Sequence, residues 1–218
     1  MTPPHHDVDR LLADIRTGSL RVTRRTSAIA LLLHGGRSVQ AQPDRFRDIS
    51  YLRMLPFGMA VMRASRGRVA PYLVHNTHGG WIASSGSGLV QARALVRGLS
   101  ETHGLPVVLL GHSSGGWAAL RIADEPGVAG AVALAPWVDE GEGIDHLVRS
   151  DAHVRVIHGE SDTVCSPVRS RAYVERAVRA GVDATFEGVP GGNHAMLDRP
   201  WRWHRRAGEA VTGLVPGA

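Results

Sequence analysis

Val107-Val-Leu-Leu-Gly-His-Ser-Ser-Gly-Gly-Trp117 is the stretch of sequence that decides the fold. Its apolar start predicts a buried strand, and the small residues that follow Gly115 predict a helix. Between them stands Gly111-x-Ser-x-Gly, a pattern typical of a sharp strand-to-helix turn that holds a serine hydroxyl at the end of a sheet. Only Ser113 has glycine two residues before and two residues after it. We therefore expect Ser113, rather than Ser114, to be a nucleophile.

Short apolar runs alternate with amphipathic stretches along the rest of the chain. Six apolar runs predict strands, at residues 28–33, 69–75, 107–111, 129–135, 154–158 and 184–189. Five amphipathic stretches predict helices, at residues 51–64, 89–102, 116–123, 144–148 and 168–180. The alternating pattern of residues 19–23 predicts an additional edge strand. Strands that alternate with helices predict an α/β protein with a mainly parallel sheet and helices on both faces.

Length and composition indicate a globular protein. The chain has 218 residues, of which 43% are hydrophobic and 21% are charged. We expect one α/β domain over residues 19–218, preceded by an arm and short helix over residues 1–18. No apolar run approaches the ~20 residues that cross a bilayer, and the N-terminus lacks the pattern of a secretory signal. Cys165 is the single cysteine, and together these features predict a cytoplasmic protein.

The formal net charge is +5, and all 25 basic residues are arginines. They are scattered along the chain, which favours a solvated surface over a binding patch for nucleic acid or membrane. Residues 199–206, Arg-Pro-Trp-Arg-Trp-His-Arg-Arg, superficially resemble a basic aromatic patch for nucleic acid. We interpret them as a terminal amphipathic helix that covers the sheet, and we expect neither a nucleic-acid nor a membrane partner.

A serine hydroxyl becomes a good nucleophile only when a base takes its proton. His194, in Gly-Gly-Asn-His after the last predicted strand, is the candidate base. Asp162, in His-Gly-Glu-Ser-Asp after the preceding strand, is the candidate acid that orients the base, with Glu160 and Asp139 as alternatives. Because the carboxyl ends of parallel strands share one edge of a sheet, we expect these residues to converge there in the chain order Ser, Asp, His.

An oxyanion that forms during attack on an acyl carbon needs N–H donors. The backbone N–H of Ser114, at the start of the helix, is one candidate. The loop His34-Gly-Gly-Arg after the first strand offers the second, from Gly36 or from Arg37. Five side chains near strand ends are candidates for lining a substrate pocket: His34, His78, His112, Trp81 and Trp137.

Four motifs resemble the α/β-hydrolase superfamily, and within it small lidless esterases similar to dienelactone hydrolase. They are Leu-His-Gly-Gly at 33–36, Gly-His-Ser-Ser-Gly-Gly at 111–116, His-Gly-Glu-Ser-Asp at 158–162 and Gly-Gly-Asn-His at 191–194. The resemblance covers most of the chain and implies hydrolysis of a carboxylic ester, thioester or related acyl bond in a small molecule, without a dissociable cofactor. Only residues 137–150 separate two predicted strands, which leaves no room for the helical cap of many relatives.

Some alternatives remain open at this point. Five histidines near strand ends raise a zinc-site hypothesis: His34, His75, His78, His112 and His158. No short-range ligand pair such as His-Glu-x-x-His supports it, and we expect no metal. Cys165 lies near Asp162 in the sequence without a turn motif of its own, and we expect an inert thiol. The serine could instead pass its acyl group to an alcohol or amine, as in an acyltransferase or cyclase, or the chain could be a non-catalytic binding protein.

Overall fold

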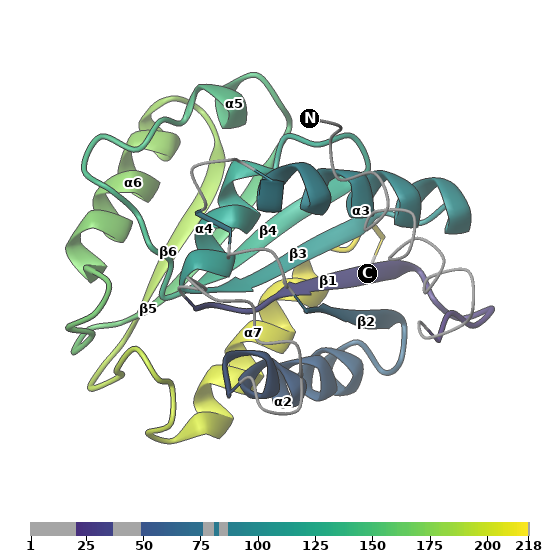
Figure 1. Cartoon of the computed structure of the whole chain (residues 1–218), viewed down its shortest axis with the longest axis horizontal. Helices are drawn as coiled ribbons and strands as arrows, with labels where there is room; N and C mark the ends of the chain where they lie inside the picture. Colours follow the sequence, from purple (N-terminus) through teal and green to yellow (C-terminus); the bar gives the residue numbers. More distant parts are fainter. Residues whose placement is uncertain (1–20, 37–48, 76–80, 83–86, 218) are drawn as a thin grey trace.

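The computed structural model of the chain describes residues 21–36, 49–75, 81–82 and 87–217, in which strands alternate with helices (Figure 1). The strands are β1 (Ala28–Leu33), β2 (Val69–Val74), β3 (Val107–His112), β4 (Val128–Leu134), β5 (His153–Gly159) and β6 (Asp183–Val189). The helices are α2 (Ile49–Ala64), α3 (Ser87–His103), α4 (Ser114–Arg121), α5 (Asp145–Val148), α6 (Pro167–Arg179) and α7 (Pro200–Gly213). The six strands and five helices predicted between residues 28 and 189 are therefore confirmed.

The strands form one parallel sheet in the order β2-β1-β3-β4-β5-β6. Since β1 lies between β2 and β3, the chain first extends the sheet toward one edge and then toward the other. In a parallel sheet, such a reversal creates a crevice at the carboxyl ends of the strands beside it. The segment after β1 and the segment after β3 therefore meet at one place on the sheet edge.

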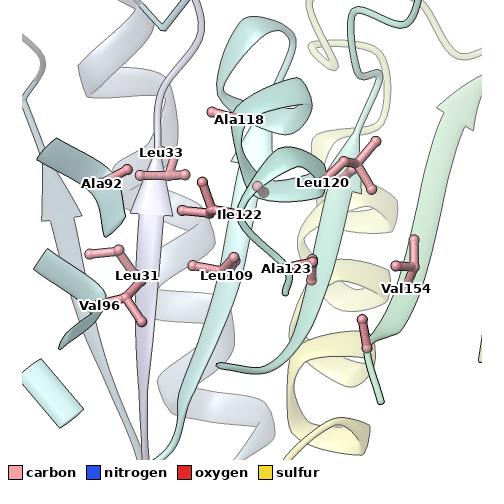
Figure 2. Close-up of a cluster of buried hydrophobic side chains, with 14 of the residues drawn as sticks. Leu31, Leu33, Ala92, Val96, Leu109, Ala118, Leu120, Ile122, Ala123 and Val154 are labelled. Carbon is pink, nitrogen blue, oxygen red and sulfur yellow. The ribbon is translucent and has the colours of Figure 1, made fainter. Parts of the chain in front are cut away.

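Helices cover both faces of the sheet, and the strand residues alternate between two apolar clusters. In β1, Leu31 packs in a cluster with residues of α3 and α4, whereas Leu32 packs in a cluster with residues of α2 and α7. Figure 2 shows the first cluster, where Leu31 and Leu109 lie beside Val96 of α3 and Ile122 after α4. Burial on both faces explains why the predicted strands are continuously apolar runs.

The two helices nearest the C-terminus begin with recognisable signals. Ser166 accepts a hydrogen bond from the backbone N–H of Arg169, and Pro167 is the first residue of α6, where a missing N–H costs nothing. Helix α7 also begins with proline, and its Trp203 is fully buried against the sheet. The interpretation of residues 199–206 as part of a terminal helix that covers the sheet is therefore confirmed.

The predicted edge strand at residues 19–23 is wrong for the part that the structure describes. Residues 21–23 are not in a strand, and a turn follows them. In this turn, the N–H of Thr26 donates to the carbonyl of Thr23, and the N–H of Thr23 donates to the Thr26 hydroxyl. These local hydrogen bonds replace those that a strand would have made. Residues 19 and 20, and the helix expected around residues 8–15, lie outside the described residues.

The connection from β4 to β5 contains a single helix, α5, of four residues. No helical cap is inserted at this point, in agreement with the expectation from the short spacing. Among the helices that the structure describes, none is both long and apolar enough to cross a membrane.

Candidate active site

Ser113 alone forms the turn between β3 and α4. Its backbone has φ of 57° and ψ of −120°, a strained conformation that residues with a side chain rarely adopt. Two glycines allow this turn to pack closely. A Cβ atom on Gly111 would overlap the carbonyl of Gly115, and a Cβ atom on Gly115 would overlap the carbonyl of Leu33 in β1. The tight packing fixes Ser113 at the carboxyl edge of the sheet.

Ser113, His194 and Asp162 come from three different strand ends and form one chain of hydrogen bonds. Ser113 follows β3, Asp162 follows β5 and His194 follows β6. The Nε2 atom of His194 lies 3.1 Å from Oγ of Ser113, and its Nδ1 atom lies 2.8 Å from Oδ2 of Asp162. The serine hydroxyl can donate to Nε2 while Nδ1–H donates to the carboxylate. The structure thus brings together the three residues that the sequence singled out.

The two alternative carboxylates lie elsewhere. Asp139 accepts a hydrogen bond from the indole N–H of Trp137, at 3.2 Å. Glu160 is exposed, and its carboxylate lies over Gly188 in β6. Among the residues that the structure describes, Asp162 is therefore the carboxylate that contacts His194.

Asp162 is held by four donors. Its Oδ1 atom accepts from the backbone N–H groups of Val164 and Cys165, at 2.8 and 2.9 Å. Its Oδ2 atom accepts from His194 and also from Nε2 of His158, at 3.1 Å. Burial by itself would raise the pKa of Asp162, but the hydrogen bonds from His158, His194 and the two backbone groups outweigh it and hold the pKa well below its ordinary value. The side chain is therefore an ionised, fixed carboxylate.

His158 is the one contact in this group whose role sequence reasoning missed. Its side chain is fully buried at the end of β5. Its Nε2 atom lies near Oδ2 of Asp162 and the carbonyl of Cys165, both of which can only accept, so Nε2 carries a proton. Nδ1 shares a hydrogen bond with the hydroxyl of Ser170 on α6, at 3.0 Å. His158 thereby ties the carboxylate to the helix packed behind it.

The loop after β1 is held by side-chain hydrogen bonds to three consecutive carbonyls. The indole N–H of Trp81 donates to the carbonyl of His34 at 2.7 Å, and Nδ1–H of His34 donates to the carbonyl of Gly35 at 2.7 Å. The hydroxyl of Ser114 donates to the carbonyl of Gly36 at 3.0 Å. Because each carbonyl is fixed, the peptide N–H groups between them are fixed as well. The loop is thus held rigidly next to the turn at Ser113.

Ser114 and Gly36 are the predicted oxyanion donors that the structure describes. Ser114 is the first residue of α4, so its backbone N–H has no acceptor within the helix and lies at the positive end of the helix dipole. Both residues line the same cavity as Ser113. Arg37, the alternative donor, lies outside the described residues.

His112 lies immediately before Ser113, and its side chain is buried. Its Nε2 atom donates to the carbonyl of His194 at 3.0 Å, and the two rings lie 4.9 Å apart. Burial, together with the charges of His194 and Arg53, lowers the pKa of His112 to about 3. The ring is therefore neutral, and it supports the backbone that carries His194.

A cavity of about 350 Å³ opens beside Ser113. Besides Ser113, Ser114, Gly36, His112 and His194, its lining residues are Gly35, Ser50, Arg53, Ile82, Trp137 and Val164. The expected pocket residues His112 and Trp137 do line it. His34 and Trp81 are instead buried where they support the loop after β1, and His78 lies outside the described residues. Ser50 and Arg53 of α2 also line the cavity, although the sequence analysis did not single them out.

Two alternatives from the sequence remain, a zinc site formed by histidines and a reactive thiol at Cys165. Among the described residues, no group of three or more His, Cys, Asp or Glu side chains is arranged to hold a metal ion. Burial and the negative charge of Asp162 raise the pKa of Cys165 to about 11, although a hydrogen bond with Ser113 opposes the shift. At neutral pH, Cys165 is a protonated and poorly nucleophilic thiol.

Known proteins similar to this chain are found by structure and not by sequence. No protein-family model matches the sequence, and no curated protein matches it either. Among solved structures, a truncated carbohydrate esterase from gut microbiota aligns with a TM-score of 0.70 and 14% identity, covering 88% of this chain and 87% of that one. A monoacylglycerol lipase from Paleococcus ferrophilus has a TM-score of 0.64 and 15% identity, covering 90% and 99%. The esterase domain of a Rhodothermus marinus protein has a TM-score of 0.62 and 16% identity, covering 89% and 88%.

The parallel sheet, its strand order and these similarities define the class of fold. The chain has the single-domain α/β-hydrolase fold, and the expectation from the four sequence motifs is confirmed at that level.

Proposed function

We propose that this chain is a serine hydrolase that cleaves a carboxylic ester, thioester or related acyl bond through an acyl-enzyme. The observation that carries the proposal is the continuous hydrogen-bond path from the Ser113 hydroxyl through His194 to the ionised Asp162. Such a path gives a serine the base that it needs in order to attack an acyl carbon. The esterase and lipase activities of structural neighbours agree with this choice of reaction.

In the first half of the reaction, Nε2 of His194 takes the proton of Ser113 as Oγ attacks the acyl carbon. The imidazolium that forms is stabilised by the carboxylate of Asp162, which keeps Nδ1 protonated and the ring in place. The oxyanion is bound by the backbone N–H groups of Ser114 and Gly36. Collapse of the tetrahedral intermediate breaks the bond to the leaving group, which receives its proton from Nε2–H of His194.

In the second half, a water molecule attacks the acyl-enzyme. His194 takes a proton from this water, a second tetrahedral intermediate forms in the same oxyanion site, and its collapse returns the proton to Oγ of Ser113. The product acid is released, and the enzyme is regenerated. Every proton moves between substrate, water, Ser113 and His194, so the reaction needs no further group.

The test is the turnover of 4-nitrophenyl butyrate by Ser113→Ala. We expect kcat/KM to fall by about a thousandfold or more, because the attacking oxygen is removed while the fold remains. Ser161→Ala is the matched control, since it removes an exposed hydroxyl from the loop that carries Asp162. Equal turnover by wild-type protein and Ser113→Ala would refute the proposed function.

A further inference from the structure

Arg53 is the charged residue of the cavity that the proposed reaction leaves without a task. It lies in the second turn of α2, lines the cavity beside Ser113 and is half-buried. Among the described residues, the cavity lining also contains His112 and His194, but no aspartate or glutamate. The positive side chain therefore faces the space that a substrate would fill.

Several partly buried arginines of this protein pair with a carboxylate, whereas Arg53 pairs with none among the described residues. Arg93 pairs with Asp124 and Glu125, Arg155 pairs with Asp183, and Arg206 pairs with Glu187. No described acidic side chain makes an ion pair with Arg53, and burial lowers its pKa from the ordinary value without an acid to oppose the shift. A partly desolvated charge without a partner is unfavourable, and an anion that enters the cavity would relieve this cost.

The other described residues of the cavity lining are polar on α2 and apolar elsewhere. Ser50, in the first turn of α2, lines the cavity together with Arg53. Trp137, Val164 and Ile82 contribute apolar surface to the cavity. The site is thus suited to a molecule with an anionic end and an apolar body.

We infer that Arg53 forms an anion subsite in the cavity of Ser113, and that the preferred substrates are esters carrying a second, ionised carboxylate near the scissile bond. The guanidinium matches a carboxylate with two parallel hydrogen bonds, which a neutral substrate cannot make. The inference rests on the proposed function, because it assigns the substrate class of that same site.

The experiment compares pairs of esters that differ only in charge. In one arm the anion is on the acyl side, with 4-nitrophenyl monoesters of succinic, glutaric and adipic acid against their neutral carboxamide analogues. In the other arm it is on the alcohol side, with the acetyl ester of 4-hydroxybenzoate against that of 4-hydroxybenzamide. The measured quantity is the ratio of kcat/KM for the anionic ester to kcat/KM for its neutral partner, over the uncatalysed background.

We expect the wild-type ratio to exceed one in at least one of the two arms. The arm with the high ratio shows whether the bound carboxylate belongs to the acyl or to the alcohol part of the substrate. Arg53→Gln should lower this ratio by about tenfold to a hundredfold, the value of a charged hydrogen-bonded pair. Arg53→Lys keeps the charge and should restore part of the ratio. Arg63→Gln removes an exposed arginine of the same helix outside the cavity and should leave the ratio unchanged.

A measurement on the wild-type protein makes the test independent of any variant. The ratio should fall as salt is added, because salt screens the attraction between a carboxylate and a partly exposed guanidinium. Wild-type ratios near one in both arms, a ratio that Arg53→Gln retains, or a ratio insensitive to salt would each overturn the inference. If the neutral esters are turned over by Ser113 in those cases, the proposed function stands and the Arg53 subsite alone fails. If no ester is turned over, both fail.

Discussion

The Nε2 atom of His158 lies 3.1 Å from Oδ2 of Asp162, the same oxygen that Nδ1 of His194 approaches to 2.8 Å. One carboxylate oxygen thus accepts from two histidines, one facing the cavity and one fully buried behind it. The buried histidine is itself fixed by Ser170 on α6. The position of the carboxylate therefore depends on the packing of a helix on the far side of the site.

This relationship predicts that His158→Ala will destabilise the protein by about 2–4 kcal/mol, because it leaves a cavity and removes a donor from a buried carboxylate. His158→Gln keeps an N–H donor and should therefore lose less stability than His158→Ala. The free energy of unfolding in urea measures both. His153→Ala, at the exposed start of the same strand, is the control and should cost less than about 1 kcal/mol. Equal losses for His158→Ala and His153→Ala would contradict the account.

The glycines of the turn give a second prediction. Gly115→Ala places a methyl group on the carbonyl of Leu33, which belongs to the interior strand β1 and is held by hydrogen bonds to strands on both sides. We expect a loss of about 3 kcal/mol or more, or a failure to fold, as is usual when backbone must shift in a packed core. Gly143→Ala is the control, because a Cβ atom there meets nothing within 4 Å. The soluble yield and the urea midpoint of the two variants measure the loss of stability. A Gly115→Ala variant as stable as Gly143→Ala would show that the turn is not closely packed.

The buried His112 predicts a pH dependence of stability. Its pKa is about 3 in the folded protein and about 6.5 in an unfolded chain. Between these values the unfolded state binds a proton that the folded state does not bind, so stability rises with pH in this window and is lost on acidification. The slope from this one group reaches at most about 1.4 kcal/mol per pH unit.

We therefore expect His112→Gln to show a shallower loss of unfolding free energy than the wild-type protein between about pH 7 and about pH 5. Urea unfolding at several pH values in this range gives the two slopes. Identical slopes would mean that His112 takes up a proton in the folded protein as readily as in the unfolded chain.

The strands and most helices of this fold were predictable because their signals are local. An apolar run such as residues 28–33 is buried on both faces, and Ser166 with Pro167 marks the start of a helix wherever that helix packs. The residues 19–23 misled because alternation of side chains carries no information on whether a neighbouring strand is present. There, the hydrogen bonds between Thr23 and Thr26 within a turn prevailed.

The residues of the candidate site also fall into those that the sequence could identify and those that it could not. Ser113, Asp162 and His194 follow strand ends in motifs whose spacing is visible in the sequence, and so they could be selected in advance. The positions of Arg53 and His158 in the site could not be predicted. Arg53 reaches the cavity because of where α2 begins in space, and His158 is held by a contact with α6. His34 was expected in the pocket, but it supports a backbone carbonyl instead, a distinction that only the folded loop makes.

The central claim is that Ser113 is the nucleophile, and covalent labelling tests it most directly. The protein is treated with a fluorophosphonate, its intact mass is measured, and the modified residue is located by peptide mapping. We predict addition of one phosphonyl group, on Ser113, and its loss in Ser113→Ala and in the wild-type protein after heat denaturation. Label on Ser114 or Cys165, or no label on folded wild-type protein, would contradict the account.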